Sequence, residues 1–213
     1  MAKTLRARTP VQKRGIETKA KVIEAAKTLF IEKGYYKTHA LEIAARAGVA
    51  TGSFYSYFND KKEVLLELIR QFYQKALEKA LSVVDEEMLR SGDGRKIIHL
   101  VIQALYEIHD SQKDLHRVLF PLMLMDKEGL EINRREEQKI IQFIAAYLGQ
   151  HRNLLRVSDM HAAAEIALRT SDEIIHRILF WGPVSDATIL IQELEDMLCR
   201  YLIVPPESDH QTR

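Results

Sequence analysis

The sequence predicts an all-α protein, and three observations indicate it. Glycine and proline number only 9 and 5 in 213 residues, whereas average usage gives roughly 25. Where they occur, they leave long stretches free of both, including 53–91 and 150–181. Apolar side chains in these stretches recur at helical spacing, and sheet proteins need a turn about every ten residues. All-β and α/β folds are therefore excluded.

Composition excludes further classes of protein. Hydrophobic residues make up 46% of the chain, enough to bury a core, which disordered chains cannot do. No uncharged apolar run approaches the ~18 residues of a membrane span, and the basic N-terminus lacks the apolar segment of a secretory signal. The single cysteine, Cys199, cannot form an internal disulfide. We therefore expect a cytoplasmic protein that has no membrane partner.

About nine helices are expected, bounded by glycines, a proline and capping residues. Gly34 and Gly48 end the first two helices as C-cap glycines would. Asp60 and Glu63 match a capping box at the start of a long helix, and Pro121 is expected to break or kink a later one. The helices are predicted over 18–33, 39–47, 51–58, 61–84, 95–110, 112–124, 127–151, 159–181 and 186–203.

Charge divides the chain into two domains. Residues 1–62 hold 13 Lys+Arg and 5 Asp+Glu, whereas residues 63–213 hold 18 and 25. This asymmetry favours a polyanion-binding domain over 1–62 joined to a larger acidic domain over 63–213. The most basic part, 1–14, is either a polyanion-binding arm or a solubilising disordered tail.

Within the basic domain, two short helices joined by a tight turn at Gly48 form a helix-turn-helix, an arrangement that binds DNA. The second helix, 51–58, is small enough for a major groove about 12 Å wide. Its hydroxyl side chains can bond to bases and phosphates, and Gly52 lets the backbone approach DNA closely. The alternative is a plain helical hairpin in which Phe54 and Phe58 are core.

Many spaced positions in residues 18–65 carry a family resemblance. They include Val22-Ile23-Glu24-Ala25-Ala26, Leu29-Phe30, Gly34-Tyr35, Glu42-Ile43-Ala44, Ala47-Gly48-Val49, Gly52-Ser53-Phe54-Tyr55, Tyr57-Phe58 and Lys61. This pattern resembles the DNA-binding domain of the tetracycline-repressor (TetR/AcrR) family of bacterial transcription regulators. The resemblance implies a three-helix DNA-binding domain followed by a helical regulatory and dimerisation domain.

The resemblance also implies which residues meet DNA. They are Thr38, His39, Thr51, Gly52, Ser53, Tyr55, Tyr57 and Lys61. Lys61 matches a family lysine that contacts phosphate. Two positions depart from the family pattern: His39 replaces a Ser or Thr, and Ala50 replaces a Ser before the recognition helix. Capping of that helix is therefore expected to shift to Thr51.

For the larger domain, the resemblance implies an effector pocket and a second subunit paired through the last two helices. The dimer-interface candidates are Ile191, Leu194, Leu198 and Tyr201, unless this is an ordinary core helix. Polar residues beside apolar stripes predict a largely hydrophobic cavity for a neutral or weakly charged lipophilic molecule. Its candidate residues are Tyr106, His109, Met123, Phe143, Tyr147 and Thr170. The alternative is that these residues simply complete the core.

Glu173 and His176 form one Glu-x-x-His pair, half of a di-iron bundle motif. The second copy is missing, so we expect no metal, no other cofactor and no enzyme activity. The sequence thus predicts a homodimeric transcription regulator that binds a palindromic operator in double-stranded DNA. The favoured form is a repressor that a small molecule releases from this operator. A helical metal-binding enzyme using Glu173 and His176 is one alternative, and an architectural DNA binder without effector is another.

Overall fold

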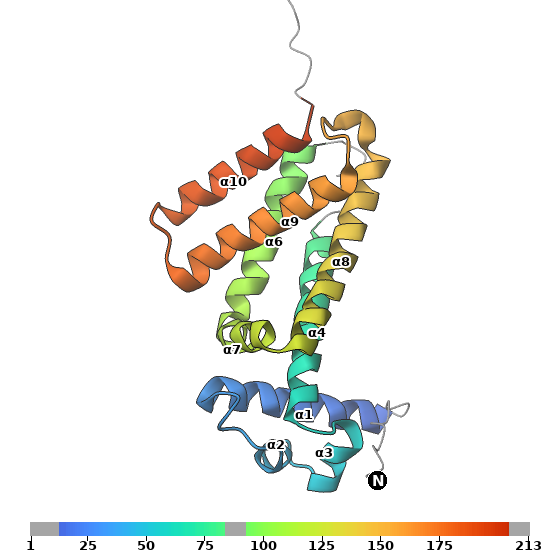
Figure 1. Ribbon diagram of the computed structural model, residues 1–213, viewed down its shortest axis with the longest axis vertical. Helices are drawn as coiled ribbons and strands as arrows, with labels where there is room; N and C mark the ends of the chain where they lie inside the picture. Colours follow the sequence, from blue (N-terminus) through green and yellow to red (C-terminus); the bar gives the residue numbers. More distant parts are fainter. Residues whose placement is uncertain (1–12, 84–92, 205–213) are drawn as a thin grey trace, which may run out of the picture. The chain divides into compact units, whose positions relative to one another are not determined.

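The computed structural model describes residues 13–83 and 93–204, and the regular elements there are helical (Figure 1). Nine α-helices occur in this part of the chain: α1 (Lys13–Lys33), α2 (Ala40–Arg46), α3 (Thr51–Tyr57), α4 (Lys61–Ser82), α6 (Gly94–Ser111), α7 (Lys113–Met125), α8 (Lys127–Gln150), α9 (Met160–His176) and α10 (Ala187–Leu202). A 3-10 turn, η1 (Arg152–Leu154), and a π-helical turn, η2 (Arg177–Trp181), accompany them. The all-α prediction is confirmed.

The predicted helix boundaries agree closely with the structure, apart from two differences. α1 begins at Lys13, before the expected Thr18. α7 continues through Pro121, so of the expected break or kink the break was wrong. Leu119 and Met123 are buried on either side of the proline, and their burial outweighs the one backbone donor that proline removes. Residues 1–12 of the basic N-terminal arm and Val84 lie outside the described residues.

The chain forms two compact units. The first, here called the head, contains the described residues 13–73 together with 114–134, and the second, here called the body, contains 74–113 and 135–204 as far as they are described. The head therefore extends past the boundary predicted at residue 62 and includes α7.

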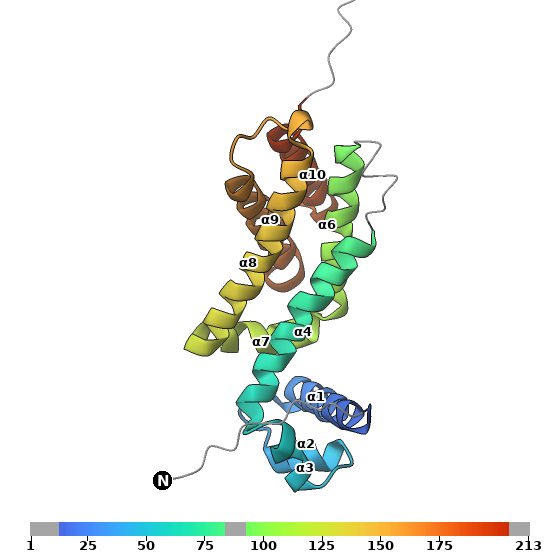
Figure 2. The ribbon, with the colours of Figure 1, turned by 90° about the vertical axis from the view of Figure 1, so that its right-hand side faces the viewer.

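The head is built around one hydrophobic core. Apolar residues three to four positions apart on α1 are fully buried, as the helical period requires. They meet side chains from the next three helices, and together these are Val22, Ala26 and Phe30 of α1, Ile43 of α2, Phe54 of α3 and Val64 of α4. Figures 1 and 2 show α2 and α3 beside α1 and the first turns of α4. This core fixes the positions of the two short helices, α2 and α3, within the head.

Three helices of the body, α6, α9 and α10, pack against one another (Figures 1 and 2). Ile102 of α6 meets Leu194 and Leu198 of α10, and Ile174 of α9 packs at their edge. A second cluster joins α8 to the start of α9 and the end of α10. No described helix is long and apolar enough to span a membrane.

Aspartates at the N-termini fix where the body helices begin. Asp93 accepts a hydrogen bond from the Lys96 N–H (3.0 Å), and Asp159 accepts one from the Ala162 N–H (3.0 Å). Such caps satisfy backbone donors that the first helical turn leaves without partners. After α9 and η2, Gly182 has a φ of +78° and separates η2 from α10, between the helices predicted over 159–181 and 186–203.

Candidate functional site

A tight turn connects α2 to α3. Gly48 adopts a φ of +66°, which glycine tolerates far better than other residues. The Val49 N–H then donates to the Ala44 carbonyl (3.0 Å), closing the end of α2. Buried Ile43 and Phe54 anchor the two helices in the head core. The sequence thereby sets the direction in which α3 leaves the turn.

α3 presents a polar outer face. Gly52, Tyr55 and Ser56 are exposed, and Tyr55 keeps 49% of its surface accessible. Thr51 and Ser53 are half-buried. Tyr57, also half-buried, packs against the head core. Among the predicted residues of this helix, Gly52 and Tyr55 therefore lie most openly on the surface.

Ala50 is the N-cap residue of α3, with extended backbone angles and no side-chain cap. Its carbonyl accepts from the N–H groups of Ser53 (2.8 Å) and Phe54 (3.3 Å). Thr51 is already the first helical residue. The expectation that capping shifts to Thr51 was therefore wrong, because the helix starts one residue too early for its hydroxyl to cap it.

Two residues predicted to contact DNA form hydrogen bonds within the head. Thr38 is completely buried, and its hydroxyl donates to the Gly34 carbonyl (2.9 Å). The Lys61 ammonium group donates to the carbonyls of Tyr35 (2.8 Å), Tyr36 (3.3 Å) and Thr38 (2.8 Å). An ammonium group has three donors, so these bonds leave none for a phosphate. Burial lowers the pKa of Lys61.

The segment between α1 and α2 exposes residues that the sequence did not single out. Tyr36 and Lys37 are exposed there, beside the exposed predicted residue His39. The His39 N–H donates to the Glu42 carboxylate (2.9 Å), which also accepts from Lys33 (2.5 Å). These two hydrogen bonds lower the pKa of Glu42, the one from Lys33 more strongly. The sequence could have indicated this surface, because Tyr36 and Lys37, an aromatic and a basic residue, follow shortly after Gly34.

The structure does not bring the six predicted effector residues together. Met123 is buried in the head core, not in the body. Phe143 on α8 is 44% exposed and so does not line a buried wall. Tyr147 packs with the α8–α9 cluster, and Thr170 donates its hydroxyl to the Ile166 carbonyl (2.7 Å). Tyr106 is half-buried on α6.

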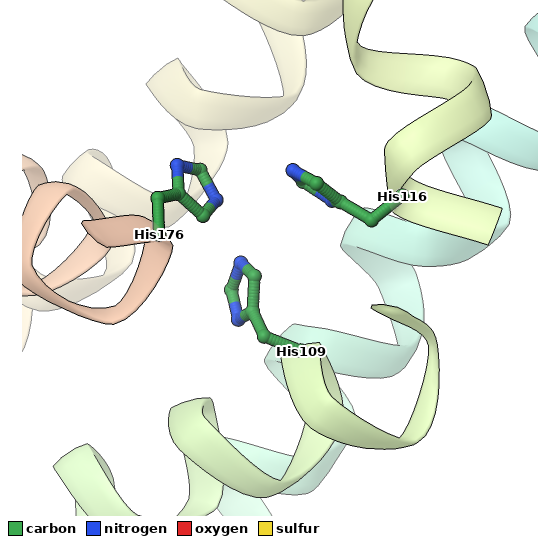
Figure 3. A group of neighbouring side chains, drawn as sticks. All are labelled: His109, His116 and His176. Carbon is green, nitrogen blue, oxygen red and sulfur yellow. The ribbon is translucent and has the colours of Figure 1, made fainter. Parts of the chain in front are cut away.

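His109, the sixth of these residues, lies instead beside His176. Both are buried, and their ring centroids are 5.1 Å apart (Figure 3). Glu173, the predicted partner of His176, is exposed and pairs with Arg177 (3.5 Å). The pair proposed for a metal enzyme is therefore not assembled. The third histidine in Figure 3, His116, belongs to the head, where its ring stacks on Phe120.

Of the four predicted dimer residues, two are buried within their own chain and two are half-buried. Leu194 and Leu198 are buried within their own chain, Ile191 packs at the edge of that cluster, and Tyr201 packs on the α8–α9 cluster. α10 has apolar residues on more than one side, and the neighbouring helices of the same chain cover only one of these sides. The exposed apolar residues from α9 to α10 are Ile166, Trp181, Val184, Ile189 and Met197.

Two short helices on a buried aromatic core, the second with a polar outer face, define a helix-turn-helix DNA-binding module. Residues 22–68 match the bacterial regulatory proteins of the tetR family. Residues 95–202, about half of the chain, match the tetracyclin repressor-like C-terminal domain. The chain belongs to the tetR family and is a DNA-binding transcription regulator.

Similar proteins span almost the whole chain. YdgC of Bacillus subtilis, an uncharacterized HTH-type transcriptional regulator, is 25% identical over 93% of this chain and 99% of its own. The fatty acid degradation regulator FadR of Bacillus halodurans has a TM-score of 0.68 at 20% identity, covering 89% and 96% of the two chains. SmeT, the repressor of the Stenotrophomonas maltophilia multidrug efflux pump SmeDEF, has a TM-score of 0.65 at 19% identity, covering 92% and 96%. The two structural likenesses establish a common fold.

Proposed function

We propose that this chain is a homodimeric repressor that binds a palindromic operator through α3 and leaves it when a small lipophilic molecule binds the body. The observation that carries the DNA-binding part is Gly52. This glycine is exposed in a helix, and a Cβ at its position would meet no atom within 4 Å beyond its two chain neighbours and the backbone of its own helix. Glycine in a helix costs up to about 1 kcal/mol relative to alanine. A DNA backbone that approaches this position closely would explain why glycine is present despite this cost.

Gly52→Ala tests this assignment. Operator duplexes are first enriched from a random library on the purified chain, and we expect an inverted repeat with half-sites about 34–36 Å apart. The variant should lose at least about tenfold in operator affinity, equivalent to about 1.4 kcal/mol, while its free energy of unfolding stays equal or rises. Gly149→Ala is the matched control, because that helical glycine of α8 also has open space around it. Equal affinities of both variants and the unmodified chain would contradict the proposal.

Tyr55 is proposed to read bases, because its exposed ring ends in a hydroxyl that can bond to base edges. Tyr55→Phe removes only that hydroxyl. Fluorescence anisotropy should show a larger loss on the operator than on random duplex DNA. Tyr147→Phe, a body variant, is the control and should bind both DNAs as the unmodified chain does. An equal loss of affinity for the operator and for random DNA would mean that Tyr55 contacts the DNA phosphate backbone instead of reading bases.

The dimer is proposed to form through the exposed apolar side chains on α9, η2 and α10. Ile189 (55% exposed) and Met197 (44% exposed) lie eight residues apart on one face of α10. Exposed apolar surface of this kind marks protein interfaces. Dimerisation would present two copies of α3 to successive major grooves.

Sedimentation of Ile189→Glu and Met197→Glu tests this interface. Each variant should place a charge in an apolar contact, dissociate the dimer and lose operator affinity. Leu81→Glu, an exposed apolar position on α4, should leave the dimer intact. A DNA-competent monomer, or dimers unaffected by either α10 variant, would overturn the assignment.

The effector is proposed to be lipophilic and to bind among α6, α8 and α9. Tyr106, Tyr147 and Thr170 remain the candidate contacts, since all three belong to the body and lie at its half-buried positions. The excess of acidic residues over 63–213 disfavours a multiply charged anion. The names of FadR and SmeT, which refer to fatty acids and to multidrug efflux, fit an apolar ligand class.

Release of labelled operator measures this response. A panel of fatty acids and neutral aromatic compounds is added to the complex, and at least one should lower its anisotropy. Tyr147→Ala should weaken the response several-fold while leaving operator affinity without effector unchanged. Phe143→Ala, at an exposed position of α8, is the control. Release by no compound in the panel would favour an architectural DNA binder.

A further inference from the structure

The histidine pair in the body is not explained by DNA binding. His109 stands near the end of α6, and His176 is the last residue of α9. Both side chains are buried, and their rings meet edge to face at an interplanar angle of 66° (Figure 3). Two buried imidazoles from different helices can offer ring nitrogens to one ligand.

A hydrogen bond fixes the proton of His109. Its Nδ1 lies 2.8 Å from the Leu105 carbonyl oxygen. A carbonyl only accepts, so Nδ1 carries the proton and Nε2 keeps its lone pair. Metal-binding histidines commonly donate their second ring nitrogen to a backbone carbonyl in this way, which orients the ring and raises its basicity.

Burial favours the neutral form of both rings. Burial lowers the pKa of His109. Burial also lowers the pKa of His176, to about 4, and the neighbouring His109 adds to this effect. Neutral imidazole is the form that binds metal ions, so the burial of these rings favours the form that a metal ion needs.

The distance between the two ligands suits one shared ion. The ring nitrogens that the two residues offer lie within 4.8 Å of one another. Two imidazoles on a tetrahedral zinc ion, with bonds of about 2.0–2.1 Å, have nitrogens about 3.3 Å apart. Bringing the two nitrogens to this separation would take a shift of at most about 1.5 Å.

The backbone beside His176 is also unusual. The π-helical turn η2 begins at the next residue, Arg177, and runs to Trp181. The Phe180 ring packs 5.5 Å from the His176 ring, and the Arg177 guanidinium lies 5.0 Å from the centre of the Trp181 ring. π-Helical turns are rare and often occur at functional sites. This turn and the fixed proton of His109 are independent features of the same place.

We propose that His109 and His176 bind one divalent transition-metal ion, of which Zn²⁺ is the representative, in the body of each chain. Imidazole nitrogen suits zinc, nickel and copper better than magnesium or calcium. Further ligands such as water complete the coordination. No sequence motif predicted this site, because its ligands lie on two helices 67 residues apart in the chain.

Calorimetry on the full chain, freed of metal with a chelator and without DNA present, tests the proposal. Zn²⁺ should bind at one ion per chain. His109→Gln and His176→Gln should each weaken binding at least about 100-fold, because changing a residue that only supports a ligand already costs 10–100-fold. His161→Gln is the matched control, since His161 is an exposed histidine in the first turn of α9. Absence of binding to the unmodified chain, or an equal effect of all three variants, would overturn the site.

Two further measurements keep the test independent of folding defects in the variants. Co²⁺ added to the unmodified chain should give visible absorption bands typical of nitrogen coordination, and Zn²⁺ should remove them. Nitrogen NMR of the histidine rings should show two resonances that shift on saturation with Zn²⁺, and both should remain in the spectrum of His161→Gln. Shifts at exposed histidines alone would show surface binding and refute the proposal.

Discussion

The head and the body differ in what fixes their functional side chains. In the head, local features determine exposure: the Gly48 turn sets the path into α3, and buried Phe54 leaves its neighbour Tyr55 facing outward. In the body, side chains with the same helical spacing have unrelated neighbours. Met123, predicted to line a body cavity, is buried in the head, and Phe143 is exposed. Periodicity shows that a residue lies on an apolar face but does not show what covers that face.

The largest effect should come from breaking the anchor of α3. Phe54→Ala removes a fully buried ring and should lower the free energy of unfolding of the head by about 3–5 kcal/mol. Tyr55→Ala, the adjacent exposed position, should change it by less than about 0.5 kcal/mol. Hydrogen exchange of the α1–α3 amides in urea measures both. Similar losses from the two variants would mean that α3 is not oriented by Phe54.

The helices were predictable because their signals are local. Gly34, Gly48 and Asp60 stop or start helices through their own backbone or side-chain chemistry, as the structure confirms. Thr38 and Lys61 were assigned to DNA by resemblance. Thr38 bonds to the Gly34 carbonyl four residues before it, whereas Lys61 bonds to the carbonyls of Tyr35 and Thr38, which only the folded head brings close. Such tertiary contacts cannot be seen in spacing along the chain.

The histidine pair shows the same limit in the body. A helical stripe placed His109 on an apolar face, and a Glu-x-x-His spacing drew attention to His176. Their meeting depends on how α6 packs against α9, which no motif records. Glu173 at the matching spacing is exposed instead.

A second pair of variants compares the two sides of α10. Leu198→Ala should cost about 2–5 kcal/mol, because Leu198 is buried against Ile102 and Leu194 in its own chain. Met197→Ala, one residue earlier and exposed, should cost less than about 0.5 kcal/mol in an isolated chain. Hydrogen exchange of the body amides at a concentration where the chain is monomeric gives both values.

This comparison also separates folding from assembly. Met197→Ala should weaken self-association, measured by sedimentation across a dilution series, whereas its monomer keeps its stability. If Leu198→Ala instead weakened association with no loss of monomer stability, the original assignment of Leu198 to the dimer interface would be restored.

A smaller effect is expected from Lys61→Met, which keeps much of the apolar stem and removes the ammonium group. The carbonyls of Tyr35, Tyr36 and Thr38 lose their shared donor. The head should be destabilised by about 1–2 kcal/mol, because water can replace part of these bonds. The salt dependence of DNA binding by the folded variant should stay unchanged.

Lys37→Met is the counterpart on the exposed segment before α2. Its ammonium group is accessible to phosphate, so the variant should keep its stability and reduce the salt slope by about one counterion. Anisotropy titrations between low and moderate salt measure both slopes. A reduced slope for Lys61→Met would return that lysine to the DNA contact implied by the resemblance.

The smallest expected effect concerns a feature that head and body share. Asp60 accepts from the Glu63 N–H at 3.0 Å at the start of α4, and Asp159 accepts from the Ala162 N–H at the same distance at the start of α9. A cap depends on one local bond, so Asp60→Ala and Asp159→Ala should each cost about 1 kcal/mol in the unit that holds the cap. Asn at either position should recover most of the loss, since its amide oxygen can accept the same bond. Urea titrations followed by hydrogen exchange measure the four variants. If the head variant cost several times more than the body variant, the turn before α4 would depend on tertiary contacts as Lys61 does, and the local description of the head would fail at that point.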